Sequence, residues 1–229
     1  DKIWAEVDRD VVLADGAEAR DARVRAAYDA LAGAYADALA DELDHKPFDR
    51  WLLAEIAAGV TGPLLDLGCG PGQTTAVLAA AGAEVSGLDL APAMIEEARR
   101  RHPGVDFEVG DFARVLRPPH ASAWGGIAAW YAFVHLSGSE LPQTFSSLAR
   151  VLAPGGLFAL AVHVGNEVRH TAELFGVPVD LDFVLHDAGQ VIAAVEGAGF
   201  TDVRWYLRSP VPEEAPTQRL YVVARRGEA

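Results

Sequence analysis

Three alternating glycines follow a short apolar run in the segment LLDLGCGPG, which occupies residues 64–72. Glycine has no Cβ, so it allows both a tight turn and a close approach of the backbone to a ligand. A helix that begins directly after the glycines would point its free N–H groups toward the bound molecule. One carboxylate, Asp66, lies near the end of the apolar run. These residue types predict a cofactor-binding loop between a strand and a helix.

Two further acidic residues follow apolar segments later in the chain. Asp89 directly follows residues 84–88, and Asp111 lies just after residues 105–109 and directly before Phe112. In open α/β sheets, ligands bind outside the carboxyl ends of the strands. The two acids and the glycine loop are therefore expected at one edge of a sheet.

The segments that carry these residues alternate between strand and helix character. The predicted strands are 64–67, 84–88, 105–109, 126–130 and 156–162. One predicted helix follows the glycine loop and ends near residue 80, and the others are 92–101, 140–152 and 187–198. Such alternation predicts a parallel sheet with helices on both faces. The last two strand segments, 202–208 and 219–224, predict an antiparallel hairpin. We therefore predict an α/β fold with a Rossmann-like, doubly wound, mostly parallel seven-stranded sheet and an antiparallel C-terminal hairpin.

Helical periodicity also precedes the first strand. Residues 1–58 are predicted to form a helical extension with helices at 23–43 and 47–58, and residues 59–229 to form the cofactor-binding domain. Residues 164–186 interrupt the alternation and are predicted to be an insertion over the active edge, where they would cap the substrate.

A nicotinamide-dependent oxidoreductase is one alternative that the glycine loop leaves open. Its fingerprint, G-x-G-x-x-G, requires a third glycine at the position of Gln73. Neither lysine of the chain follows a tyrosine by four residues, so a Tyr-x-x-x-Lys pair is absent from the sequence. The sequence therefore disfavours this alternative.

The pattern D-x-G-x-G-x-G, formed by Asp66 and the three glycines, resembles motif I of the class I S-adenosylmethionine-dependent methyltransferases. The segments Gly87-Leu88-Asp89 and Gly110-Asp111-Phe112 resemble later marks of the same family, and the resemblance covers about residues 23–226. It implies S-adenosylmethionine as the cofactor and S-adenosylhomocysteine as the product. It also implies that the helical extension acts as a lid.

The resemblance assigns these positions to parts of the cofactor. The implied cofactor-binding residues are Asp66, Gly68, Cys69, Gly70 and Gly72 in the loop, Asp89 at the ribose, and Leu90, Met94, Asp111 and Phe112 at the adenine. Tyr28 and Tyr35 lie seven residues apart on one helical face, where they would contact the methionyl carboxylate or the substrate, or else dock the helix. Trp130, at the end of the fourth predicted strand, is also expected to contact the cofactor.

The segment WYAFVH at residues 130–135 bears on the acceptor. It has no Asn/Asp-Pro-Pro-Tyr/Phe box, which amino-methylating relatives carry, and no Asp or Glu lies between Asp111 and Glu140 to bind a metal ion. The segment therefore resembles small-molecule methyltransferases that use no metal. His135 is a candidate general base or else a packing residue, and Tyr131 would orient the substrate or pack in the core.

A second polar cluster follows the fifth predicted strand. His163 is a candidate for a catalytic or substrate-binding role, His170 is a weaker one, and Glu167 would orient a histidine. Surface packing is the alternative for each of them. Aromatic residues near the opening favour an apolar or planar organic acceptor, such as an aromatic or hydroxylated secondary metabolite, over a highly charged one. They leave oxygen, nitrogen and carbon open as the atom methylated.

Composition limits the partners. The net charge is −14 and the chain has only two lysines, so a nucleic-acid partner is not expected. Cys69 is the sole cysteine and no apolar run is long enough to span a membrane, so we predict a cytoplasmic location and no membrane partner. The sequence leaves monomer and homodimer open. A non-catalytic protein that binds S-adenosylmethionine on the same fold remains an alternative.

Overall fold

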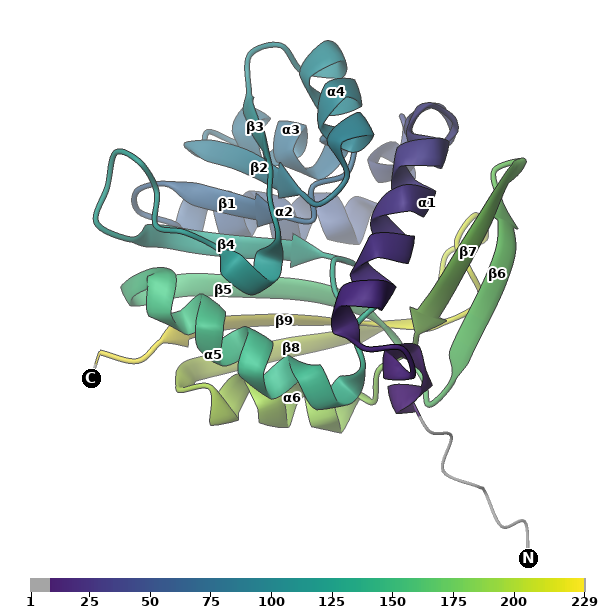
Figure 1. Ribbon diagram of the computed structural model, residues 1–229. Coiled ribbons are helices and arrows are strands. Elements are labelled where there is room, and N and C mark those ends of the chain that lie inside the picture. Colours follow the sequence, from purple (N-terminus) through teal and green to yellow (C-terminus); the bar gives the residue numbers. More distant parts are fainter. Residues whose placement is uncertain (1–8, 229) are drawn as a thin grey trace, which may run out of the picture.

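The alternating segments form one mixed sheet in the computed structural model, which describes residues 9–228 (Figure 1). Its seven strands follow the order β3-β2-β1-β4-β5-β9-β8. Their bounds are β1 Leu64–Leu67, β2 Val85–Asp89, β3 Asp106–Val109, β4 Trp124–Trp130, β5 Leu152–Val164, β8 Phe200–Arg208 and β9 Gln218–Arg226. The first five strands are parallel, and β9 pairs antiparallel with both β5 and β8. The predicted fold is thereby confirmed.

Helices cover both faces of this sheet. They are α1 Ala17–Ala38, α2 Pro47–Gly59, α3 Gln73–Ala80, α4 Pro92–Arg101, α5 Leu141–Val151 and α6 Ala188–Gly197. In Figure 1, α5 and α6 lie in front of the sheet, while α2 and α3 lie behind it. Phe145, Phe158 and Val195 belong to the apolar cluster on the front face, and Leu53, Leu78 and Tyr221 belong to the cluster on the other face.

Local signals explain where several helices begin. Proline is favoured in the first turn because its missing N–H is not needed there, and Pro47 and Pro92 begin α2 and α4. The side chain of Asp187 accepts a hydrogen bond from the Gln190 N–H at 2.9 Å and caps α6.

The first long helix differs from its prediction. It spans Ala17–Ala38 rather than 23–43, and Glu42–His45 form a separate 3-10 turn. The residue before a proline avoids the helical conformation, and Lys46, at φ −121°, precedes Pro47. The chain therefore turns before α2. Of the predicted extension 1–58, residues 1–8 lie outside the described range.

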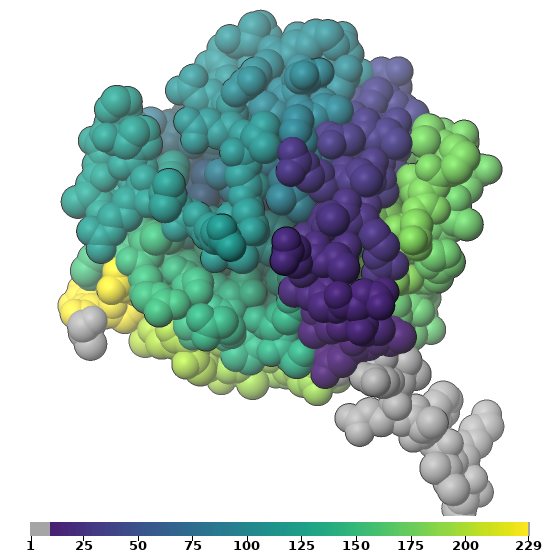
Figure 2. Space-filling view, viewed as in Figure 1, coloured from purple at the N-terminus to yellow at the C-terminus, as the bar shows by residue number. Residues whose placement is uncertain are grey.

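The segment predicted to be an insertion forms a separate two-stranded hairpin, β6 (Val168–Leu174) and β7 (Val177–Val184). Helix α1 packs against this hairpin and against α4, with Leu31, Met94 and Leu181 buried in one cluster. Figure 2 shows the purple surface of α1 beside the light-green hairpin. Among the described residues, no helix is both long enough and apolar enough to cross a membrane.

Candidate active site

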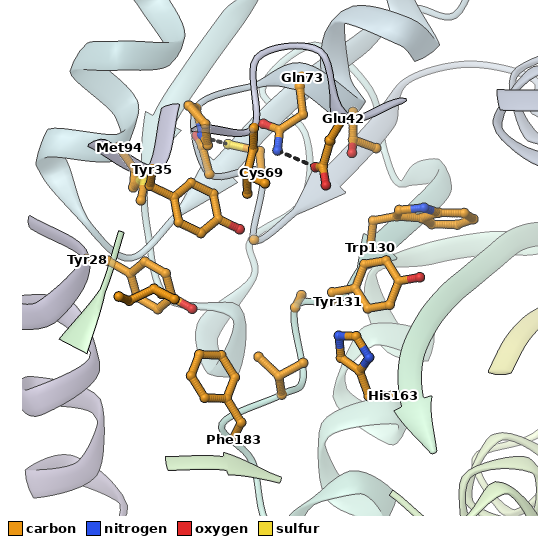
Figure 3. A pocket seen from close by; sticks show the side chains of 18 of the residues that line it. Tyr28, Tyr35, Glu42, Cys69, Gln73, Met94, Trp130, Tyr131, His163 and Phe183 are labelled. Carbon is orange, nitrogen blue, oxygen red and sulfur yellow. Dashed lines mark hydrogen bonds between the residues drawn. The ribbon is translucent and has the colours of Figure 1, made fainter. Parts of the chain in front are cut away.

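A cavity of about 750 Å³ opens at the carboxyl ends of the parallel strands. Its lining comes from α1, the loops after β1, β2 and β4, the β6–β7 hairpin, and the connection between β8 and β9. In Figure 3, Tyr28, Tyr35 and Phe183 lie across the open space from Tyr131 and His163. Most of the predicted site residues line it: Tyr28, Tyr35, Asp66, Gly68, Cys69, Gly70, Asp89, Leu90, Met94, Phe112, Trp130, Tyr131, His135 and His163.

The cofactor loop, residues 68–72, depends on glycine for its shape. Gly68, Gly70 and Gly72 have φ values of +70°, +52° and +86°, in the region that L side chains rarely adopt. A Cβ on Gly68 would lie 2.7 Å from the Cβ of Ala132, which is too close for two carbon atoms. The loop therefore packs tightly against the segment after β4 while it borders the cavity.

Asp89 is held in place by the backbone of two loops. Its Oδ2 accepts a hydrogen bond from the Gly70 N–H and its Oδ1 accepts one from the Ala91 N–H, each at 2.9 Å. Burial raises the pKa of Asp89, and these two hydrogen bonds oppose the shift. The carboxylate borders the cavity and keeps further lone pairs for hydroxyl donors.

Asp66 is more deeply buried. Its Oδ2 accepts a hydrogen bond from the Thr75 hydroxyl at 2.6 Å. Burial raises the pKa of Asp66 to about 7, Asp89 adds to the increase, and the hydrogen bond from Thr75 opposes it. A cationic group bound beside Asp66 would restore its ionised form.

Gly72 and Asp111 do not line the cavity. A Cβ on Gly72 would lie 2.7 Å from the Phe107 ring, so Gly72 faces the packed side of the loop. The carboxylate of Asp111 accepts a hydrogen bond from the Ala113 N–H at 2.8 Å and caps a 3-10 turn. Their contacts with a cofactor stay predictions, whereas Phe112 borders the cavity directly.

His135 directs the hydroxyl of Tyr28. The Nδ1 of His135 lies 2.8 Å from the carbonyl oxygen of Asp182. A carbonyl only accepts, so Nδ1 carries the proton and Nε2 accepts the Tyr28 hydroxyl, 2.8 Å away. Burial lowers the pKa of His135 to about 4, which keeps its imidazole neutral at neutral pH. Both ring nitrogens are therefore engaged, and the Tyr28 oxygen has only lone pairs left for a ligand.

Tyr131 has an unusual backbone at the end of β4. Its φ is +55°, a conformation that costs on the order of 1–3 kcal/mol for a residue other than glycine. The Tyr221 hydroxyl donates to Asp49 at 2.9 Å, so the Tyr131 hydroxyl donates to Tyr221 at 3.2 Å. The ring of Tyr131 also lies 4.8 Å from that of His163.

His163 lies near the end of β5, where its Nδ1 is 2.7 Å from the hydroxyl oxygen of Thr217. We call the part of the cavity around it the acceptor chamber, which is lined by Tyr28, Tyr131, His163, Arg169, Phe183 and Thr217. The predicted partner of a histidine, Glu167, instead binds Arg169 at 2.6 Å. His170 is exposed, contacts Asp182 at 3.0 Å and does not line the cavity.

The sequence reasoning missed Thr217 and the role of Gln73. The Gln73 side chain donates to Glu42 at 2.8 Å, as the dashed line in Figure 3 shows. Its Oε1 is buried and has no hydrogen-bond partner within residues 9–228. This free acceptor beside the cofactor loop suits an N–H donor of a bound molecule. The signal that could have identified Gln73 from the sequence was its position at the start of the helix after the glycine loop.

Comparisons with known proteins identify the family. Residues 64–156 match the family of methyltransferase domains. An uncharacterised methyltransferase of Synechocystis sp. is 32% identical over 169 residues, which cover 70% of this chain and 76% of that protein. This chain belongs to the methyltransferase family. The alternative of a nicotinamide-dependent oxidoreductase is thereby set aside.

Other relatives of this methyltransferase match it less completely or less closely. A trans-aconitate 2-methyltransferase of Methylobacterium nodulans is 41% identical over 113 residues, which are 48% of this chain and only 41% of that protein. The structure of magnesium protoporphyrin IX methyltransferase from Synechocystis, with bound S-adenosylhomocysteine, has a TM-score of 0.69 at 17% identity. It covers 90% of this chain and 99% of that chain, and it shows the shared fold.

The solved structure of similar fold holds S-adenosylhomocysteine, and the cavity of this chain suits S-adenosylmethionine chemically. The cofactor has an ammonium group, ribose hydroxyls and an adenine ring. The cavity offers the free Gln73 oxygen and Asp66 for an ammonium group, Asp89 for hydroxyls, and the apolar Leu90 and Met94 for a ring. Gly70 also lines the cavity, and nothing lies within 4 Å of a Cβ added there, so a ligand can approach the backbone at this point.

Proposed function

We propose that this protein transfers the methyl group of S-adenosylmethionine to a small organic acceptor held in the acceptor chamber. One observation carries the proposal: the cofactor loop, Asp89 and the acceptor chamber border a single continuous cavity. The methyl group of the cofactor is already activated as a sulfonium. The remaining task of the protein is to hold donor and acceptor in line and to exclude water, which supplies much of the rate.

Several further features belong to the same proposal. Helix α1 and the β6–β7 hairpin would act as the lid and cap, and His135 would position the Tyr28 hydroxyl rather than accept a proton. Metal-independent transfer is also part of the proposal, since a sulfonium methyl group needs no further activation. Two of the proteins named above carry the name of a small organic acceptor, trans-aconitate and magnesium protoporphyrin IX. The cytoplasmic location and the absence of nucleic-acid partners stay predictions.

Calorimetric titration with S-adenosylhomocysteine tests the proposal, with NAD as the comparison ligand. We expect saturable binding of the former alone. The Asp89→Ala variant should bind it more weakly by about 1–3 kcal/mol, because the ribose hydroxyls lose their acceptor. The control Asp106→Ala, which removes an exposed acid on β3, should bind like the parent chain. Equal affinity of both variants would contradict the ribose assignment, and binding without transfer to any acceptor would favour the non-catalytic alternative.

The pH dependence of binding provides a second test, centred on Asp66. Since the pKa of Asp66 is about 7 without ligand, the cofactor ammonium binds better once this carboxylate has ionised. Affinity for S-adenosylhomocysteine should therefore rise with pH, by up to about tenfold per unit below neutrality, and binding should release protons. Titration in two buffers of different ionisation enthalpy measures that release. Asp66→Asn should flatten the profile; an unchanged profile in this variant would exclude Asp66 as the linked group.

A further inference from the structure

One ring nitrogen in the acceptor chamber has no partner in the protein. The Nδ1 of His163 contacts the Thr217 hydroxyl at 2.7 Å, whereas no hydrogen bond to Nε2 occurs within residues 9–228. The ring borders the cavity, so this nitrogen is available to a ligand. Nε2 is a hydrogen-bond donor if it carries the ring proton and an acceptor if Nδ1 carries it.

The surroundings of Thr217 decide the tautomer. Its hydroxyl oxygen receives a long hydrogen bond from Arg219 Nη1 at 3.5 Å, and arginine is a donor only. The Nδ1 of His163 is the one acceptor that the Thr217 hydroxyl contacts among the described residues. Thr217 borders the cavity but is only 7% exposed, so Nδ1 is the acceptor that the protein offers to its hydroxyl proton. Thr217 therefore donates to Nδ1, and Nε2 carries the N–H that faces the chamber.

Burial keeps the imidazole of His163 neutral, and the nearby cations are themselves ion-paired: Lys46 contacts Glu42 at 2.9 Å and Arg169 contacts Glu167 at 2.5 Å. Burial is the main cause that lowers the pKa of His163 to about 4, followed by the positive charges of Arg219, Lys46 and Arg169, while Glu214 opposes them. Lys46 and Arg169 line the same cavity. The carboxylate of Glu214 is bound by both terminal nitrogens of Arg208 at 2.8 Å, so much of its charge is compensated.

Neither of the two candidate catalytic histidines, His135 and His163, then offers a lone pair to a proton on the acceptor. His135 uses its lone pair to accept the Tyr28 hydroxyl, and the exposed nitrogen of His163 carries a proton. An alcohol or a phenol must lose a proton on methylation, whereas a carboxylic acid is already ionised at neutral pH. A carboxylate therefore needs no base and is a strong acceptor for the N–H of His163.

We infer that the methyl acceptor is a carboxylate, which His163 binds by donating its Nε2–H. The inference rests on the proposed function and adds Thr217 as a positioning residue that fixes the tautomer. In the reaction a carboxylate oxygen forms the new bond to the methyl carbon. The bond from that carbon to sulfur breaks with its electron pair remaining on sulfur. The product is a neutral methyl ester, and no proton is released.

The tautomer can be measured by NMR on the full chain with isotopically labelled histidine, because protonated and unprotonated ring nitrogens have different chemical shifts. At neutral pH we expect His163 in the Nε2–H form, and Thr217→Val should convert it to a mixture of tautomers. An Nδ1–H form in the parent chain would overturn the inference.

Binding of the acceptor class is tested on the protein saturated with S-adenosylhomocysteine. The probes are acetate, benzoate and cinnamate, each beside its primary amide, with the His163 signals as the readout. We expect at least one carboxylate to bind about tenfold or more tightly than its amide, as expected for a charge-assisted hydrogen bond. Equal binding of acids and amides, or no shift of His163 with any acid, would overturn the inference.

Two variants separate a donor from a base. In His163→Gln the amide can place an N–H near the position of Nε2, so carboxylate binding should stay within about threefold of the parent, whereas His163→Leu should lose about tenfold or more. If His163 accepts a proton instead, both variants should lose methyl transfer equally. S-adenosylhomocysteine binding, measured separately, distinguishes the two proposals: failure of the carboxylate series with intact cofactor binding rejects only the acceptor class.

Discussion

Gly68→Ala is expected to destabilise the protein by about 2–5 kcal/mol and to abolish tight binding of S-adenosylhomocysteine. A left-handed backbone costs a residue with a Cβ about 1–2 kcal/mol. The clash of the added Cβ with Ala132 at 2.7 Å contributes about 1–3 kcal/mol more, since overpacking forces the neighbours to move. Here the neighbour is the segment after β4, so relief of the clash would displace a wall of the cavity.

Gly82→Ala is the matched control. Gly82 has φ +95° but nothing within 4 Å of an added Cβ, and it does not line the cavity. This variant should show the backbone cost alone, about 1–2 kcal/mol, with unchanged cofactor affinity. Denaturant unfolding gives the stability and calorimetry gives the affinity. If the two alanine variants lose the same stability and Gly68→Ala still binds tightly, the close approach to Ala132 has no role in the site.

The cofactor side of the cavity could be predicted from sequence because its determinants are local. The glycines of residues 68–72 set their own backbone, and Asp89 and Phe112 follow strands whose apolar pattern reveals their ends. Parallel strands bring their carboxyl ends to one edge, so the positions follow from the topology. The start of α1 was less predictable, because the alanine-rich sequence around it contains no strong helix-breaking signal apart from Gly16.

The acceptor side could not be predicted in the same way, because its contacts join distant segments. Tyr28 and His135 are 107 residues apart, and His163 and Thr217 are 54 apart. The sequence identified His135 as a candidate base and His163 as a candidate for a catalytic or substrate-binding role, but it contained no signal for the groups that would meet their ring nitrogens. Those groups, a backbone carbonyl and a threonine hydroxyl, determine whether each nitrogen donates or accepts.

A buried carboxylate, that of Asp49, supports the wall of the cavity, and no sequence pattern predicted its role. Asp49 is fully buried, and its Oδ1 accepts a hydrogen bond from the Trp130 indole at 3.0 Å. Its Oδ2 accepts from the Tyr221 hydroxyl at 2.9 Å and lies 3.3 Å from Arg208. Tyr221 in turn accepts a hydrogen bond from the Tyr131 hydroxyl. Asp49 therefore supports the cavity wall directly through Trp130 and, by way of Tyr221, through Tyr131.

Asp49→Ala is therefore expected to destabilise the protein by about 3–5 kcal/mol, because Arg208 loses a buried partner and the hydroxyl and indole donors lose their acceptor. The exposed pair of Asp44 and Arg50 provides the control: both side chains are at least half exposed, so Asp44→Ala should change the unfolding free energy by less than about 1 kcal/mol. Denaturant unfolding of the two variants measures the difference. A loss below about 1 kcal/mol for Asp49→Ala would mean that water or a rearranged Arg208 satisfies the donors, and Tyr131 would then hold its position without this network.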